Sequence, residues 1–70
     1  SKNTAMARQV SMYLMRNLTN LSLVDIGNQY EGRNHSTVLA SIRKVEDMIR
    51  SDTEIAATVR DISSNINSRS

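Results

Sequence analysis

The chain is 70 residues long, the size of one small domain with a limited hydrophobic core. It has no cysteine and a single histidine, so disulfides, thiolate metal sites and the usual four-ligand zinc site are excluded, and we expect no bound metal or other cofactor in this chain. The net charge is +2, no apolar run is long enough to cross a bilayer, and no secretory pattern appears. Because the chain begins with Ser and not Met, we expect it to be a domain excised from a longer parent protein.

The composition predicts an all-α fold with short connections, because proline is absent, only two glycines occur, and strong helix formers dominate. We expect a small helical bundle with four helices that forms one domain over residues 1–70. The first helix is predicted from about Ala5 to Leu18. Apolar residues recur along it at helical spacing, and the predicted buried stripe consists of Met6, Val10, Tyr13, Leu14 and Leu18.

The second helix is predicted from Ser22 to about Tyr30. Ser22 and Asp25 stand at the spacing of a capping box, with Asp in place of the usual Glu. Gly27 lies in the middle of this helix, where glycine costs roughly 1 kcal/mol relative to alanine, and we expect the close approach of a crossing helix to compensate. The residues expected to face inward are Leu23, Ile26 and Tyr30.

The third helix is predicted from Asn34 to about Arg50, after a turn at Glu31-Gly32-Arg33. Gly32 can adopt the positive φ that a tight turn demands, and Asn34 is among the best residue types for capping a helix N-terminus. The apolar positions predict one buried face, made of Val38, Leu39, Ile42, Val45 and Ile49. The opposite, solvent-facing side is predicted to carry Ser36, Ala40, Arg43, Lys44 and Asp47.

The fourth helix is predicted to begin with a second capping box, formed by Ser51 and Glu54. Its apolar stripe consists of Ile55, Val59, Ile62 and Ile66. The end of the chain is rich in Ser and Asn, so we expect residues 66–70 to form a frayed tail.

The second helix, the glycine turn and the third helix together have the layout of a helix-turn-helix unit. Such a unit enters the DNA major groove with the N-terminal end of its second helix. Helical bundles without DNA contacts show the same pattern, so the pattern alone leaves a DNA-binding unit and a plain bundle equally open.

The charges are distributed unevenly along the chain. Residues 1–44 carry six cations against Asp25 and Glu31, whereas residues 45–70 carry three cations against five carboxylates. A domain with its positive charge on one side can orient on a polyanion even when it is nearly neutral overall. From charge alone, a solvated surface with scattered charges is the favoured interpretation.

The segment from Glu31 to Ser41 resembles the signature G-G-R-D-H-T-T-V-x-H-A of the C-terminal DNA-binding domain of the bacterial replication initiator DnaA. Here it reads E-G-R-N-H-S-T-V-L-A-S. The resemblance covers about residues 2 to 50 without gaps, and it includes Arg8-Gln9, Met12-Tyr13-Leu14, Leu18-Thr19, Ser22-Leu23 and Ile26-Gly27.

The resemblance implies a set of DNA contacts. His35, the only histidine, would stand in the first turn of the recognition helix, where its ring can reach a base edge. The implied base-reading group is Asn34, His35 and Ser36. The implied contacts to the DNA backbone are Arg8, Gln9, Thr19, Arg33, Thr37 and Lys44, and for each of these a merely solvated side chain is the alternative. Arg8 and Gln9 are the preferred phosphate ligands because we place them near a helix N-terminus.

Several residues depart from the family pattern. Asn34 replaces an aspartate, so a carboxylate that only accepts hydrogen bonds becomes an amide that also donates them. A contact to a cytosine amino group could be kept, while the preference at neighbouring bases shifts. Ser36 replaces a threonine, and Ala7 and Val24 replace prolines. Residues 1–4 are expected to be the remnant of a basic loop that keeps only Lys2, so we expect weaker DNA binding than in the parent.

The sequence therefore predicts an all-α helix-turn-helix domain that binds double-stranded DNA at DnaA-box-type sites of a replication origin. It is not expected to be an enzyme, since no phosphate-binding glycine loop and no catalytic pair is present. The resemblance implies a parent with a separate ATPase module that uses ATP and Mg²⁺, a cytoplasmic, nucleoid-associated location, other copies of the initiator as partners, and acidic phospholipid as a further partner. The alternatives are a helix-turn-helix transcriptional regulator and a helical protein-interaction module.

Overall fold

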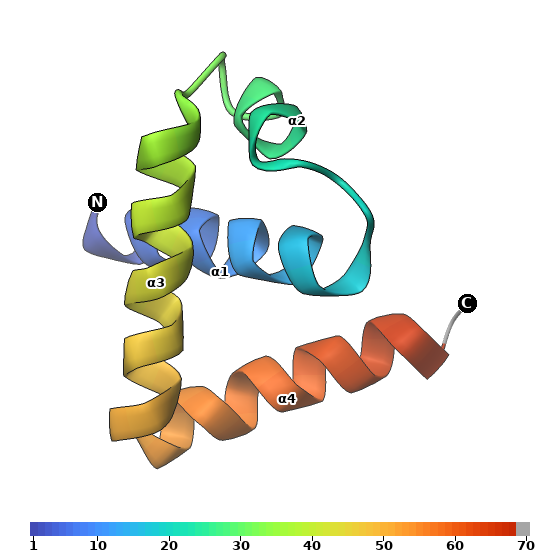
Figure 1. Cartoon of the computed structure of the whole chain (residues 1–70). Helices are drawn as coiled ribbons and strands as arrows, with labels where there is room; N and C mark the ends of the chain where they lie inside the picture. The colour runs from blue at the N-terminus through green and yellow to red at the C-terminus, as the bar shows by residue number, and fades with distance from the viewer. Residues whose placement is uncertain (69–70) are drawn as a thin grey trace.

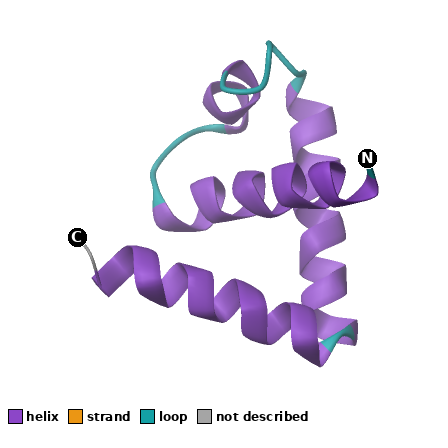
Figure 2. Ribbon diagram, turned by 180° about the vertical axis from the view of Figure 1, so that it is seen from behind, coloured by secondary structure: helices purple, strands orange, loops and turns teal. Residues whose placement is uncertain are grey.

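The computed structural model describes residues 1–68, and this part of the chain is helical with no strand. Helix α1 spans Lys2–Leu18, α2 spans Leu23–Asn28, α3 spans His35–Ser51 and α4 spans Thr53–Ser68. Figure 1 shows α3 as the central element, with α2 at its N-terminal end, α1 crossing its middle and α4 leaving from its C-terminal end. The view from behind shows that α1 and α4 extend to the same side of α3 (Figure 2). None of these helices is long and apolar enough to cross a membrane.

The core lies where α1, α2 and α3 meet. Its central cluster consists of Met12, Ile26, Val38 and Ile42, and Val45 and Val59 are also buried. The predicted inward positions of α3 are confirmed, since Val38, Ile42 and Val45 are buried and Leu39 and Ile49 are partly buried. On the opposite side of α3, Ser36, Ala40, Arg43, Lys44 and Asp47 are exposed, also as predicted.

The predicted stripe of α1 missed the most buried residue of that helix, Met12, which is 1% exposed, whereas Met6 is 36% exposed. The reason is that α1 has two different neighbours. Met12 faces α2 and α3, while Met6, Val10 and Leu14 line an apolar groove of about 470 Å³ between α1 and α4. Ile62 and Ile66 of α4 are 38% and 47% exposed, so this side of the bundle is only loosely packed.

Helix α1 begins at Lys2, three residues earlier than predicted, with the Ser1 hydroxyl accepting a hydrogen bond from the Thr4 N–H at 3.3 Å. Residues 2–4 therefore belong to the helix, and the prediction of a loop remnant over residues 1–4 is wrong. A serine at the N-cap position supplies the acceptor that the first turn needs. At the other end, α4 is helical through Ser68, three residues into the predicted frayed tail; residues 69–70 lie outside the described part.

The capping box of α2 is confirmed. The Ser22 hydroxyl accepts from the Asp25 N–H at 3.0 Å, and the Asp25 carboxylate accepts from the Ser22 N–H at 3.1 Å. Hydrogen bonding of the Ser22 hydroxyl and of the Ser22 N–H to the Asp25 carboxylate lowers the pKa of Asp25. The helix ends at Asn28, earlier than predicted, because the N–H groups of Gln29 and Tyr30 bond to carbonyls three residues back and tighten the chain into a turn.

The turn between α2 and α3 is packed directly against Gly27. The Gly27 carbonyl accepts from both the Tyr30 N–H at 3.0 Å and the Arg33 N–H at 3.1 Å. A Cβ at position 27 would lie 2.1 Å from the Arg33 carbonyl oxygen, and the nearest atom of α3, in Val38, would be 3.5 Å away. The close approach that glycine permits is therefore made by the backbone of the turn, and not by a crossing helix as predicted.

The turn contains two consecutive residues with positive φ, Glu31 at 62° and Gly32 at 72°. The φ of Gly32 confirms the prediction that this residue adopts a positive φ. The sequence pattern did not predict a positive φ for Glu31, and this conformation is costly for a residue with a Cβ. The family signature that this segment resembles has glycine at both positions, and the backbone geometry gives the physical reason for both glycines.

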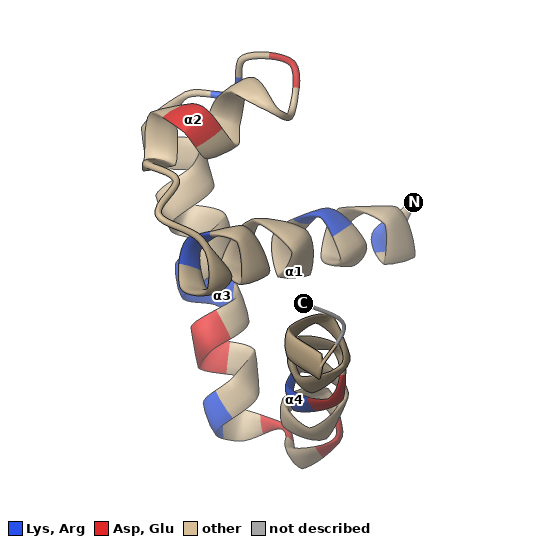
Figure 3. Cartoon of the chain, turned by 90° about the vertical axis from the view of Figure 1, so that its right-hand side faces the viewer, with Lys and Arg blue, Asp and Glu red and all other residues tan. Residues whose placement is uncertain are grey.

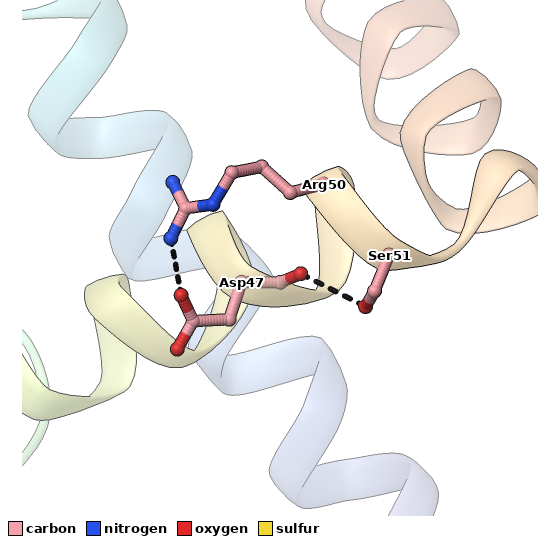
Figure 4. Close-up of polar contacts among 3 residues, drawn as sticks. All are labelled: Asp47, Arg50 and Ser51. Atoms are coloured by element: carbon pink, nitrogen blue, oxygen red, sulfur yellow. Dashed lines mark hydrogen bonds and ion pairs between the residues drawn. The ribbon is translucent and has the colours of Figure 1, made fainter.

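The junction between α3 and α4 is capped by Asp52, and the prediction of a Ser51–Glu54 capping box is wrong. The Asp52 carboxylate accepts from the N–H groups of Glu54 at 3.0 Å and Ile55 at 3.2 Å. Ser51 is the last residue of α3, and its hydroxyl donates back to the Asp47 carbonyl at 2.9 Å, beside an ion pair between Asp47 and Arg50 (Figure 4). Asp52 is the N-cap of α4 because it is the residue directly before this helix, whereas Ser51 lies one residue earlier, within α3.

We expect Gly27→Ala and Gly32→Ala to destabilise the domain to different extents. A methyl group at position 27 meets backbone that cannot move independently, and overpacking of this kind costs about 3 kcal/mol. A methyl group at position 32 meets nothing within 4 Å, so only the positive φ opposes it, at about 1 kcal/mol. Thermal or urea unfolding of the two variants measures both effects. A Gly27→Ala variant as stable as the original chain would contradict the packing described for the turn.

Candidate nucleic-acid interface

The three residues predicted to contact bases lie together at the N-terminal end of α3, next to α2 (Figure 1). Asn34 is the N-cap, His35 is the first residue of the helix, and Ser36 follows; all three are exposed. Within residues 1–68, the His35 ring, the Ser36 hydroxyl and the Thr37 hydroxyl have no hydrogen-bonding partner. The structure thus presents these polar groups to the exterior without using them for the fold.

The cap of α3 fixes the orientation of the Asn34 side chain. Its Oδ1 accepts hydrogen bonds from the Ser36 N–H at 2.8 Å and from the Thr37 N–H at 3.3 Å. The first bond satisfies the Ser36 N–H, which has no intrahelical acceptor, whereas the Thr37 N–H also donates to the Asn34 carbonyl at 3.1 Å. The predicted capping role of Asn34 is therefore confirmed, and the first turn of α3 is held in a defined conformation.

Arg8 and Arg33, predicted separately as backbone contacts, are brought together by the fold. Both line a surface hollow of about 180 Å³ between α1 and the turn, together with Gln29, Tyr30 and Glu31. The Tyr30 hydroxyl donates to the Ser11 hydroxyl at 2.5 Å, which ties the turn to α1. Two guanidinium groups beside one hollow can hold a phosphate oxygen by charge-assisted hydrogen bonds.

Glu31 also lines this hollow, and its sequence position did not predict it as part of the site. A signal for it was present in the sequence, because Glu31 occupies a position where the signature has glycine. Its charge opposes the binding of an anion beside Arg8 and Arg33.

The position of Arg8 and Gln9 differs from the expectation in one respect. Because α1 begins at Lys2, these residues lie in its second turn, beyond the first N–H groups that lack intrahelical acceptors. The expectation that a helix N-terminus assists them is therefore wrong, and only their side chains are available for a ligand. Arg8 lines the hollow, whereas Gln9 is partly buried and does not.

Thr19 has a structural role that the sequence analysis missed. Its hydroxyl donates to the Met15 carbonyl at 2.5 Å and accepts from the Leu21 N–H at 3.1 Å, so it closes the end of α1. The sequence signal for this role is a threonine directly after the last residue of a helix. Because a hydroxyl has one hydrogen to donate, a contact from Thr19 to a phosphate would compete with this bond.

The cations farther along α3 extend the exposed polar surface. Lys44 is exposed nine residues after His35, which corresponds to about 14 Å along the helix axis. Figure 3 shows basic residues on α1 and in the middle of α3, while the C-terminal half of α3 and α4 carry both acidic and basic residues, and acidic residues also appear on α2 and in the turn. Residues 1–68 contain no group of three or more His, Cys, Asp or Glu side chains that could hold a metal ion.

The comparisons with known proteins agree with this arrangement. The model of the family described as bacterial dnaA protein helix-turn-helix matches residues 1–45. The chain is 41% identical over 61 residues to the chromosomal replication initiator protein DnaA of Citrifermentans bemidjiense, an alignment that covers 87% of this chain and 13% of that protein. It is 44% identical over 59 residues to the proteins of the same name from two strains of Thermus thermophilus, with 84% of this chain and 14% of each relative covered.

The chain thus spans a small part of the length of the curated relatives it matches. No solved structure matches it. The family match includes α1, α2, the turn and most of α3, which are the elements that carry the exposed groups described above. The chain belongs to the family of bacterial DnaA helix-turn-helix domains.

Proposed function

We propose that this domain binds double-stranded DNA sequence-specifically, at DnaA-box-type sites of a replication origin, as part of a chromosomal replication initiator. The observation that carries the proposal is the exposed group Asn34, His35 and Ser36 at the N-terminal end of α3, held by the α3 cap and by the turn packed on Gly27. Membership of the DnaA family also supports it.

The dimensions of α3 suit the major groove. An α-helix with its side chains is about 10–12 Å wide, and the major groove of B-DNA is about 12 Å wide. Entry by the N-terminal end places the Asn34 amide, the His35 ring and the Ser36 hydroxyl opposite base edges. Each of these groups can form a hydrogen bond with a base edge, as reading a base sequence requires.

The proposed contacts to the DNA backbone come from α1, the turn and α3. Arg8 and Arg33 would bind a phosphate beside their common hollow, and Thr37 would donate its hydroxyl to a phosphate near the helix start. Gln9 and Lys44 are proposed as further contacts from α1 and α3. These interactions position the domain and carry no sequence information themselves.

For the parent protein, we propose an ATPase module that uses ATP and Mg²⁺, association with other copies at the origin, and a cytoplasmic, nucleoid-associated location. Acidic phospholipid is a further proposed partner of the parent. These proposals are supported by the family resemblance, and by the relatives being named chromosomal replication initiator proteins. Isolating the full-length parent and measuring ATP hydrolysis and origin binding tests them.

We expect His35→Ala to reduce sequence-specific binding while leaving the fold intact. His35 is exposed and has no hydrogen-bonding partner in the described structure, so the free energy of unfolding should change by less than about 0.5 kcal/mol. The loss of one base contact should cost about 1–3 kcal/mol on a box duplex and almost nothing on random DNA. Fluorescence anisotropy at one salt concentration measures both affinities, and thermal unfolding measures stability.

Asn65→Ala is the matched control, since it also removes an exposed polar side chain but on α4, away from the proposed interface. It should leave both affinities unchanged. A His35→Ala variant that keeps its ratio of specific to random binding would refute the proposed base contact. A wild-type domain with no sequence preference would instead indicate an interaction module of another kind.

We expect Arg8→Ala to weaken specific and random DNA binding about equally. A phosphate contact releases counterions, so its loss should reduce the slope of log affinity against log salt concentration by about 1. Arg60→Ala makes the same change in net charge on α4, where Arg60 is exposed beside Asp61 at 3.8 Å, and it should leave the slope unchanged. Equal effects of the two substitutions would mean that only net charge matters, and that Arg8 does not clamp a phosphate.

A further inference from the structure

The hydrogen bonds of Asn34 leave only one part of its side chain available to a ligand. A carbonyl oxygen has two lone pairs, and Asn34 Oδ1 already accepts two N–H groups, from Ser36 and Thr37. The amide cannot be turned around, because its NH₂ group would then face two other donors. Nδ2 must therefore point away from the helix start, and it has no hydrogen-bonding partner within residues 1–68.

The available group is thus a donor with two hydrogens on an exposed residue. In the major groove, guanine offers the acceptors O6 and N7, thymine offers O4 and adenine offers N7, whereas cytosine offers only the donor N4–H₂. Nδ2 can bond to any of the first three bases, but adenine has the donor N6–H₂ beside its N7, so guanine and thymine suit Nδ2 best. Opposite cytosine it would bring two donors face to face.

We infer that Asn34 is a specificity-determining residue that favours guanine or thymine and rejects cytosine at one position of the DNA site. This inference rests on the proposed function. It also revises the earlier expectation that a cytosine contact could be kept, because Oδ1, the atom needed for that contact, is occupied by the cap.

An aspartate at the same position has the opposite chemistry. One carboxylate oxygen can cap the helix while the other accepts a hydrogen bond from the amino group of cytosine or adenine. The signature that this segment resembles has aspartate there. The DNA site preferred by this chain should therefore differ at one base from a site read by the aspartate form.

The experiment uses the 70-residue chain, a duplex that it binds, and derivatives in which each base pair is changed in turn to the other three. For the wild-type chain we expect one position at which guanine or thymine is preferred over cytosine by about 5- to 100-fold. For Asn34→Asp we expect the preference at that position to reverse, with unchanged preferences elsewhere. Asp and Asn are equally good N-caps, so this variant keeps the fold, as thermal unfolding verifies.

Asn34→Ser is the second variant, because serine also caps a helix but its short side chain ends at the cap. It should lose discrimination at that one position only. Identical base preferences for the wild-type chain and both variants, or a wild-type preference for cytosine there, would overturn the inference. A wild-type chain that binds all duplexes equally would refute the proposed function itself. If His35→Ala loses specificity but Asn34→Asp keeps the base preferences of the wild-type chain, only the role of Asn34 is refuted.

Discussion

The contact between Gly27 and the backbone of Arg33 determines where the first turn of α3 lies relative to α2. The Gly27 carbonyl accepts two N–H groups of the turn, and the Arg33 carbonyl occupies the space where any other residue would place its Cβ. Ile26 and Val38, on either side of this contact, are completely buried. A helix-turn-helix unit works as a rigid body only if its two helices keep a fixed relation, and here backbone packing sets that relation. The exposed groups at positions 34–36 depend on it.

The same turn gathers the charges that a polyanion would meet. Arg33 follows directly on the residues with positive φ, and the turn places it beside Arg8 of α1 at a common hollow. Glu31 lies at that hollow as well, in a backbone conformation that suits glycine better, so this chain combines a local strain with a local negative charge. Asp25 lies on α2, but the other five acidic residues lie between Glu46 and Asp61, so the protein has an electrostatic direction despite its small net charge (Figure 3).

The sequence predicted those features whose signals are local. The stripe of α3, the Asn34 cap and the Ser22–Asp25 capping box depend on spacing within one helix, and the structure confirms all three. The burial of Met12 was not predictable in this way, because α1 has apolar residues on more than one side and only tertiary packing decides which side faces α3. Asp52 was missed because Ser51 offered a competing capping pattern one residue earlier.

The candidate site was predicted as a set of residues but not as an arrangement. The family resemblance supplied Arg8 and Arg33 as separate contacts, whereas their shared hollow depends on how the turn folds back toward α1. The bonding of Thr19 and the orientation of the Asn34 amide also required atomic positions. Sequence patterns identify residue types, and the hydrogen bonds in the structure then show which atoms of these residues are still available to a ligand.

The central claim is that the N-terminal end of α3 and the adjoining hollow form the DNA-binding surface. The most direct measurement is an NMR titration of the ¹⁵N-labelled chain with a duplex containing a DnaA box, followed residue by residue. The account predicts that the largest shift changes occur at residues 33–37 and around Arg8, while residues 55–66 of α4 change little. Changes concentrated along the groove between α1 and α4, with residues 33–37 unaffected, would contradict it.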